Sequence, residues 1–124
     1  MAVYRRIDHT ALHVADLEAS KAFYEKHFGF ETYSEHGTPG GFGIAYLRLG
    51  GTVLELTGRA DPQVGGFHFC LETDDFDGAV AGLKASGVEV RTDPHATAAR
   101  EPREEGWRRV VFVGPDGELI EIRG

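Results

Sequence analysis

Residues 7–12 (IDHTAL) and residues 66–71 (GFHFCL) decide the fold, because the same kind of strand opens each half of the chain. Both carry a histidine at the third position, and both are followed by acidic residues and then by apolar residues at helical spacing. Each half closes on a strand in which a glutamate stands between aliphatic residues, 53–56 (VLEL) and 119–122 (LIEI). An order that recurs in this way indicates an internal repeat.

Local signals give the elements inside each repeat. Asp16 and Asp75 are suited to cap the start of a helix, and Gly29 and Gly87 are suited to end one. Tight hairpin turns are expected at residues 50–51 and 115–117. Helices are expected over residues 19–27 and 78–86, and loops over residues 35–43 and 95–106. The sequence therefore predicts an α+β fold of two βαβββ modules, about 6–57 and 66–123, within one domain spanning 1–124.

Composition narrows the classes of partner and location. The chain has 124 residues and a formal net charge of −7, which argues against binding to a nucleic-acid backbone, because that binding needs clustered cations. No stretch approaches the roughly 18 apolar residues of a membrane span. Cys70 is the single cysteine, so no internal disulfide can form and a reducing compartment, the cytoplasm, is expected.

Side chains alternate along each strand, and this alternation places four polar side chains on the face of the sheet away from the helices. Residues two apart in a strand share a face, so the aliphatic neighbours that pack under the helices send the polar residues between them to the opposite, inner face. A lone histidine or glutamate there is more often an ordinary hydrogen-bonding residue. The same two types at matching places in two repeats instead predict a divalent-cation site, because buried carboxylates need a partner. The four residues, expected in the middle of their strands, are His9, Glu55, His68 and Glu121.

These segments resemble the vicinal oxygen chelate superfamily, also called the glyoxalase, bleomycin-resistance and dioxygenase superfamily. The likeness covers residues 6–122, and the segments that carry it are 7–14 (IDHTALHV), 22–24 (AFY), 29–30 (GF), 53–57 (VLELT), 67–69 (FHF) and 115–122 (PDGELIEI). The resemblance implies that the eight strands form an open cup. The sequence departs from the family pattern at Gly114, where aspartate is common before the proline.

The resemblance also implies a ligand set and an activity. Glyoxalase I enzymes place metal ligands in the first, fourth, fifth and eighth strands, which correspond here to His9, Glu55, His68 and Glu121. The bacterial form is similar in having His, Glu, His and Glu in that order. A lyase or isomerase of this type moves a proton within a 2-oxoaldehyde–thiol adduct through an enediolate, with Glu55 and Glu121 as ligands and candidate bases. Nickel, cobalt or zinc is favoured, and manganese or iron also suits such ligands.

Other readings of the same scaffold stay open. One is a different metal enzyme, an epimerase or a ring-opening dioxygenase, and another is a drug-binding resistance protein without turnover. A small-molecule substrate is expected in each case. Four arginines near residues 100–109 could attract an anionic substrate or simply belong to a solvated loop: Arg100, Arg103, Arg108 and Arg109. A homodimer is expected, because an open cup leaves strand edges for a second copy to cover.

Overall fold

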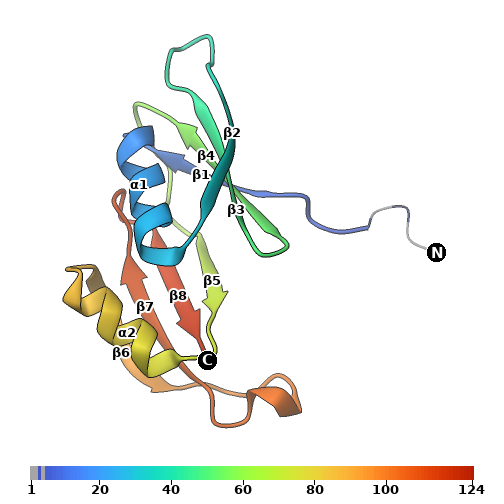
Figure 1. Cartoon of the computed structure of the whole chain (residues 1–124), viewed down its shortest axis with the longest axis vertical. Helices are drawn as coiled ribbons and strands as arrows, with labels where there is room; N and C mark the ends of the chain where they lie inside the picture. Colours follow the sequence, from blue (N-terminus) through green and yellow to red (C-terminus); the bar gives the residue numbers. More distant parts are fainter. Residues whose placement is uncertain (1–2, 4) are drawn as a thin grey trace. The chain divides into compact units, whose positions relative to one another are not determined.

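The computed structural model describes residues 3 and 5–124, which form two compact units divided between Val64 and Gly65. The first unit contains β1 (Thr10–Val14), α1 (Leu17–Phe28), β2 (Glu31–His36), β3 (Ile44–Leu49) and β4 (Thr52–Gly58). The second contains β5 (His68–Glu72), α2 (Phe76–Ala85), β6 (Glu89–Ala96), a short 3₁₀ helix (Pro102–Glu104), β7 (Arg108–Val113) and β8 (Leu119–Arg123). The predicted α+β fold with two βαβββ modules is confirmed (Figure 1).

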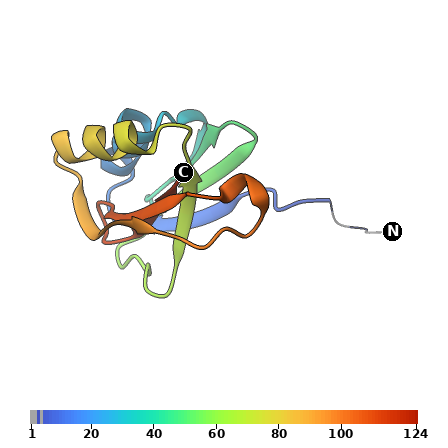
Figure 2. The same ribbon diagram turned by 90° about the horizontal axis from the view of Figure 1, so that it is seen from below.

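Each unit builds one four-stranded mixed sheet with the same topology. The strand orders are β1-β4-β3-β2 and β5-β8-β7-β6, and in each the first strand of the module runs parallel to the last. The remaining neighbours are antiparallel and are joined by hairpins. In the first unit α1 packs against β2, β3 and β4. In the second, α2 lies along one face of its sheet (Figure 2).

The helices begin and end where the sequence predicts, within two residues. The Asp16 carboxylate accepts a hydrogen bond from the backbone N–H of Ala19 at 3.0 Å, and Asp75 does the same for Gly78. These contacts satisfy N–H groups that have no partner inside the helix. Gly29 ends α1 at φ 75°, a left-handed conformation that a side chain disfavours.

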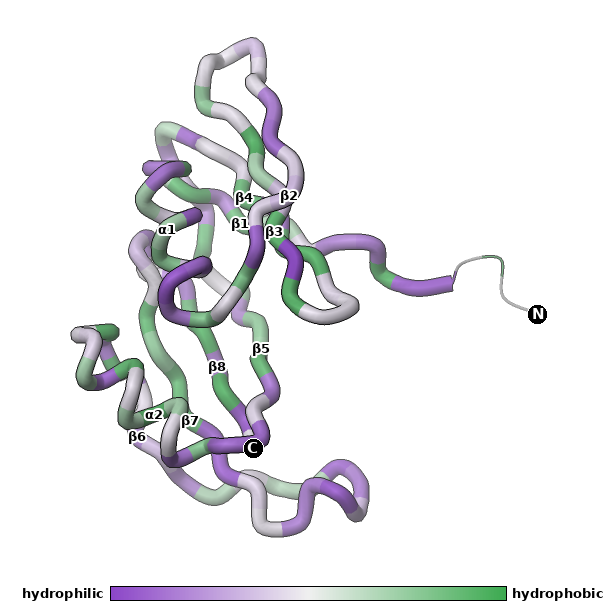
Figure 3. Tube along the Cα trace, viewed as in Figure 1, coloured by the Kyte–Doolittle hydropathy of each residue, from purple (hydrophilic) through white to green (hydrophobic). Residues whose placement is uncertain are grey.

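Apolar residues from the strands form the core of each unit. Val14, Leu47 and Leu56 are fully buried in the first unit, as are Val110, Phe112 and Ile120 in the second. Burying one such side chain contributes about 1.5–3 kcal/mol. Figure 3 shows the hydrophobic residues running along β7 and β8, in contrast to the hydrophilic segment between β6 and β7.

The structure corrects four expectations about strand boundaries. Residues 35 and 36 belong to β2, so the loop expected over residues 35–43 begins later. His9 precedes β1, and His68 is the first residue of β5, so neither lies in the middle of a strand. The segment expected to be a loop from His95 is partly strand, because β6 continues to Ala96 through two irregularities in its ladder. Such bulges interrupt the alternation of side chains and hide a strand from pattern reading.

The turn between β7 and β8 explains the departure at Gly114. The Glu118 side chain is fully buried and folds back onto this turn, where its Oε1 accepts a hydrogen bond from the backbone N–H of Asp116 at 2.8 Å. A Cβ added at Gly114 would lie 2.3 Å from the Glu118 carboxyl carbon. Glycine at this position therefore makes room for the carboxylate of Glu118.

Within the part of the chain that the structure describes, no helix has the length and apolar character needed to cross a bilayer.

Candidate metal centre

In the first unit, His9 and Glu55 face each other. His9 Nε2 lies 3.3 Å from Glu55 Oε1, and the other ring nitrogen, Nδ1, lies 2.9 Å from Asp8 Oδ2. The hydrogen bond to His9 lowers the pKa of the Asp8 carboxyl. A carboxylate on the far nitrogen of an imidazole is the common outer partner of a metal-ligating histidine, because it fixes the orientation of the ring.

Two neutral groups hold the rest of the Glu55 carboxylate. The Thr57 hydroxyl donates to Oε2, the oxygen that does not face His9. Tyr46 stands directly opposite Glu55 in the β3–β4 ladder, and its hydrogen bond to Glu55 raises the pKa of the phenol. The side chain of Glu55 is 13% exposed, so these contacts form in a half-buried setting.

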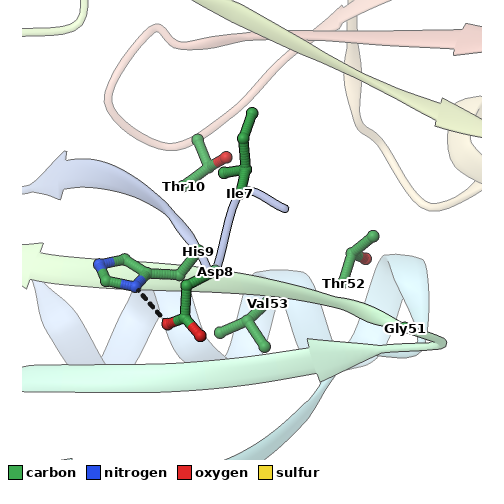
Figure 4. Close-up of a pocket in the computed structure, with 7 residues that line it drawn as sticks. All are labelled: Ile7, Asp8, His9, Thr10, Gly51, Thr52 and Val53. Atoms are coloured by element: carbon green, nitrogen blue, oxygen red, sulfur yellow. Dashed lines mark hydrogen bonds and ion pairs between the residues drawn. The ribbon is translucent and has the colours of Figure 1, made fainter. Parts of the chain in front are cut away.

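A small cavity of about 240 Å³ lies beside His9. It is bounded by residues 7–10, by Gly51 in the hairpin turn, and by Thr52 and Val53 at the start of β4 (Figure 4). Ile7 and Val53 supply apolar surface, while Thr10 and Thr52 supply hydroxyl groups. The cavity is open to solvent, so a small polar molecule can reach His9 from this side.

In the second unit, His68 and Glu121 repeat the pairing. His68 Nε2 lies 3.4 Å from Glu121 Oε1, and the Glu121 side chain is 11% exposed. The other oxygen, Oε2, accepts a hydrogen bond from Arg109 Nε at 2.8 Å. Arg109 Nη1 lies 3.3 Å from His95 Nε2, so the guanidinium contacts the His95 imidazole as well as the Glu121 carboxylate.

Cys70 lies opposite Glu121 in the β5–β8 ladder and is exposed. Desolvation of the sulfur and the nearby Glu121 carboxylate raise the pKa of this thiol to about 11. Since the thiolate is the nucleophile, a thiol with this pKa reacts poorly at neutral pH.

The arginines of the 100–109 segment all have carboxylate partners inside the second unit. Arg100 and Arg123 both bond to Glu104, which is fully buried, and the hydrogen bonds from Arg100 lower the pKa of Glu104 to about 2. Arg103 pairs with Glu101 and Glu72, Arg108 with Asp77, and Arg109 with Glu121. Recognition of an anionic substrate by these residues stays a prediction, and their charges already serve contacts within the unit.

The four predicted ligands therefore appear as two pairs, one in each unit. Among the residues that the structure describes, no group of three or more His, Cys, Asp or Glu side chains is gathered as a metal site. Pattern reading missed the partners of these pairs: Asp8, Tyr46, Thr57 and the Arg109–His95 contact. Tyr46 could have been found, because a two-residue turn at Gly50-Gly51 places residues 46 and 55 opposite each other.

Comparison with known proteins agrees with this fold. The model of the Glyoxalase/Bleomycin resistance protein/Dioxygenase superfamily matches residues 6–122, and the chain belongs to that superfamily. The chain is 34% identical to human mitochondrial methylmalonyl-CoA epimerase, over 94% of this chain and 72% of the relative. It is 33% identical to a probable lactoylglutathione lyase of Vibrio cholerae, over 94% of this chain and 88% of the relative.

A solved structure extends the comparison to a protein that binds an antibiotic. TnmS3, an antibiotic binding protein from a Streptomyces species, superposes with a TM-score of 0.79 at 25% identity. The match covers 98% of this chain and 97% of that one. Relatives of this fold thus include an epimerase, a lyase and a binding protein, so the fold alone does not decide the activity.

Proposed function

We propose that this chain is a metal-dependent enzyme of the glyoxalase I type, which isomerises the adduct of a small 2-oxoaldehyde and a thiol. The observation that carries the proposal is the repeated pair, in which a histidine Nε2 faces a glutamate Oε1 at 3.3 Å in one unit and 3.4 Å in the other. Imidazole nitrogen and carboxylate oxygen together suit a divalent transition metal. The similarity to the Vibrio cholerae lyase supports the same activity.

The proposed ligands of one divalent cation are His9, Glu55, His68 and Glu121. In each unit the pair brings together a nitrogen and an oxygen that can bind such a cation. The second oxygen of each glutamate accepts a hydrogen bond from a neighbouring side chain, Thr57 or Arg109. Nickel, cobalt or zinc is favoured, with manganese or iron as further choices. When bound, such a cation stabilises negative charge that develops on substrate oxygens during proton transfer.

The glutamates supply the proton transfer in this proposal. One carboxylate, of Glu55 or Glu121, removes the proton from the hydroxyl-bearing carbon of the adduct. The proton then returns to the neighbouring carbon, and the hydroxyl proton passes to the oxygen of that carbon, so one C–H and one O–H bond break and one of each forms. The product is therefore an isomer of the substrate and nothing else is consumed. A positioned carboxylate of this kind contributes about 10²–10⁴-fold to a rate.

A second candidate activity is epimerisation next to a thioester carbonyl. The 34% identity with human methylmalonyl-CoA epimerase favours it. Two carboxylates suit this reaction as well, since one can remove a proton from one face of a carbon while the other delivers a proton to the opposite face. Ring-opening dioxygenation and antibiotic binding without turnover are further candidates, and the experiment below separates the binding protein from the lyase and the epimerase.

The experiment offers two substrates to protein loaded with nickel, cobalt or zinc. One arm mixes methylglyoxal with glutathione and follows the thioester product, and the other follows deuterium entry into methylmalonyl-CoA in D₂O. Glu55→Gln and Glu121→Gln should abolish the active arm, whereas Glu89→Gln, a change to an exposed glutamate of β6, should not. Turnover in the second arm alone would replace the lyase proposal by the epimerase. If the protein binds no metal and turns over neither substrate, the remaining candidate function is antibiotic binding without turnover.

The working unit is proposed to be a homodimer in the cytoplasm. The edge strands are β1 and β2 in the first sheet and β5 and β6 in the second, and a second copy of the chain can cover such edges. Mixing inactive Glu55→Ala chains with inactive Glu121→Ala chains tests whether a site is shared between two chains. Regained activity indicates sharing, while no activity despite proven subunit exchange indicates sites within one chain. A fully active protein that sediments as a monomer would contradict the dimer.

A further inference from the structure

A row of aromatic side chains extends from the His9–Glu55 pair across the first sheet. The Tyr46 ring lies 5.7 Å from the His9 ring, 6.0 Å from the His36 ring and 6.4 Å from the Tyr33 ring, measured between centroids. We call Tyr33, His36 and Tyr46 the aromatic row. His9 belongs to the proposed metal site, so the row begins at that site.

Strand register explains why the row shares one face with Glu55. Tyr46 is paired with Glu55 across β3 and β4, and His36 is paired with Ile44, which is two residues from Tyr46. The ladder between β2 and β3 shifts between Thr32 and Ser34, which leaves Tyr33 as an extra residue in a bulge. A bulge redirects a side chain, and here the Tyr33 ring lies beside Tyr46.

The row is not part of the core. The neighbours of Tyr46 in β3, Ala45 and Leu47, are fully buried on the opposite face, where α1 packs. Tyr33 is 42% exposed, and His36 is exposed as well. Cross-strand aromatic pairs stabilise a sheet, but this function does not require a continuous row that ends at a carboxylate.

The two ends of the aromatic row make different contacts within the first unit. The Arg48 guanidinium, a flat group, lies over the Tyr33 ring at 4.0 Å from its centroid. At the other end, the Tyr46 phenol is hydrogen-bonded to Glu55. A flat group bound along the row would therefore have its reactive carbon at the Glu55 end, and aromatic rings at such separations attract one another.

We propose that the aromatic row is a substrate subsite for a flat, unsaturated ring attached to the 2-oxoaldehyde carbons. This inference rests on the proposed function and names its substrate class as aryl rather than alkyl 2-oxoaldehydes. Tyr33 and His36 are specificity-determining residues in this proposal, because they contact the ring and not the reacting carbons. A methyl group is too small to reach them.

The test compares two glutathione adducts, those of phenylglyoxal and methylglyoxal, by the ratio of their kcat/KM values. Tyr33→Leu should lower this ratio about five- to tenfold, as expected for loss of an aromatic contact. The methylglyoxal value should change less than about twofold, since a flat-ring contact is absent there. Tyr33→Phe should keep the ratio, because it keeps the ring. Phe42→Leu is the matched control, since Phe42 is 45% exposed and lies in the loop before β3.

Binding without turnover separates this inference from the proposed function. Phenylglyoxylate and pyruvate are titrated into the protein, and the ring signals of the tyrosines are followed by NMR. Preference for phenylglyoxylate that disappears in Tyr33→Leu supports the subsite even if neither adduct is turned over. His36→Leu gives the same test if Tyr33→Leu does not fold. Equal binding of both acids, or an unchanged preference in the variants, would overturn the proposal.

Discussion

The two halves of this chain repeat a histidine–glutamate pair but surround it differently. In the first unit, the second oxygen of Glu55 is held by the neutral hydroxyl of Thr57, and in the second unit that of Glu121 is held by the guanidinium of Arg109. Both contacts involve a carboxylate, but only the guanidinium brings a full opposite charge to it. The repeat therefore supplies two carboxylates in different settings, because Thr57 and Tyr46 donate to Glu55 while Glu121 forms an ion pair with Arg109.

Loss of the ligands themselves should have the largest effect on metal affinity. Glu55→Ala and Glu121→Ala each remove a proposed ligand, so each should weaken metal binding by more than the roughly 10–100-fold typical of losing an outer partner. The measurement is metal content after equilibrium dialysis. Full metal content in both variants would show that the paired glutamates are not ligands.

The outer partners should differ in their effects if the comparison between the halves is right. Arg109→Gln removes a charged donor from Glu121 and should weaken metal binding by about 10–100-fold. Thr57→Val removes a neutral donor from Glu55, and we expect a smaller loss. The cobalt-loaded protein gives an independent readout, because its visible absorption spectrum reports ligand geometry.

Arg108→Gln is the matched control for Arg109. Arg108 pairs with Asp77 at 2.9 Å and contacts the Phe76 ring, so its loss leaves Glu121 unchanged. An equal loss of cobalt affinity in Arg108→Gln and Arg109→Gln would mean that net charge, and not the contact with Glu121, is responsible.

The hairpin turns next to the two glutamates should respond differently to an added methyl group. Gly114→Ala forces a Cβ against the buried Glu118 carboxylate and should cost about 1–3 kcal/mol, the range for overpacking. Gly51→Ala, in the corresponding turn of the first unit, meets no heavy atom within 4 Å and should be almost neutral. Urea unfolding measures both free energies. A neutral Gly114→Ala variant would refute this account of why glycine stands there.

A difference between the halves is also expected in acid. Arg100 lowers the folded-state pKa of Glu104 to about 2 from the usual 4.5, so the charged form stabilises the second unit above pH 4.5. That contribution should be lost as the pH falls from 4.5 toward 2. Urea midpoints of the wild type and of Glu104→Gln should therefore converge over this range. A constant difference between them at all pH values would argue against the linkage.

The sequence was sufficient to predict the repeat, the helix caps and the face on which each glutamate lies. Those features depend on local chemistry and on the alternation within one strand. The partners of the glutamates depend on which residues meet across strands, and this needs the register. The pairing of Tyr46 with Glu55 could have been predicted because the β3–β4 hairpin is regular. The pairing of His95 with Arg109 could not, because it follows two register shifts in the β6–β7 ladder. The roles of the four proposed ligands in binding a metal stay predictions.

The bulge at Tyr33 has a consequence for how this site can change over generations. Residues on either side of Tyr33 keep a consistent pairing with β3, and Glu35 reaches Lys21 of α1 at 2.7 Å from the opposite face. Removing the single codon for Tyr33 would join Thr32 to Ser34 in a regular ladder without turning either flank over. The ring is therefore an addition that a lineage can gain or lose in one step, so the proposed substrate preference can change while the proposed metal ligands stay in place.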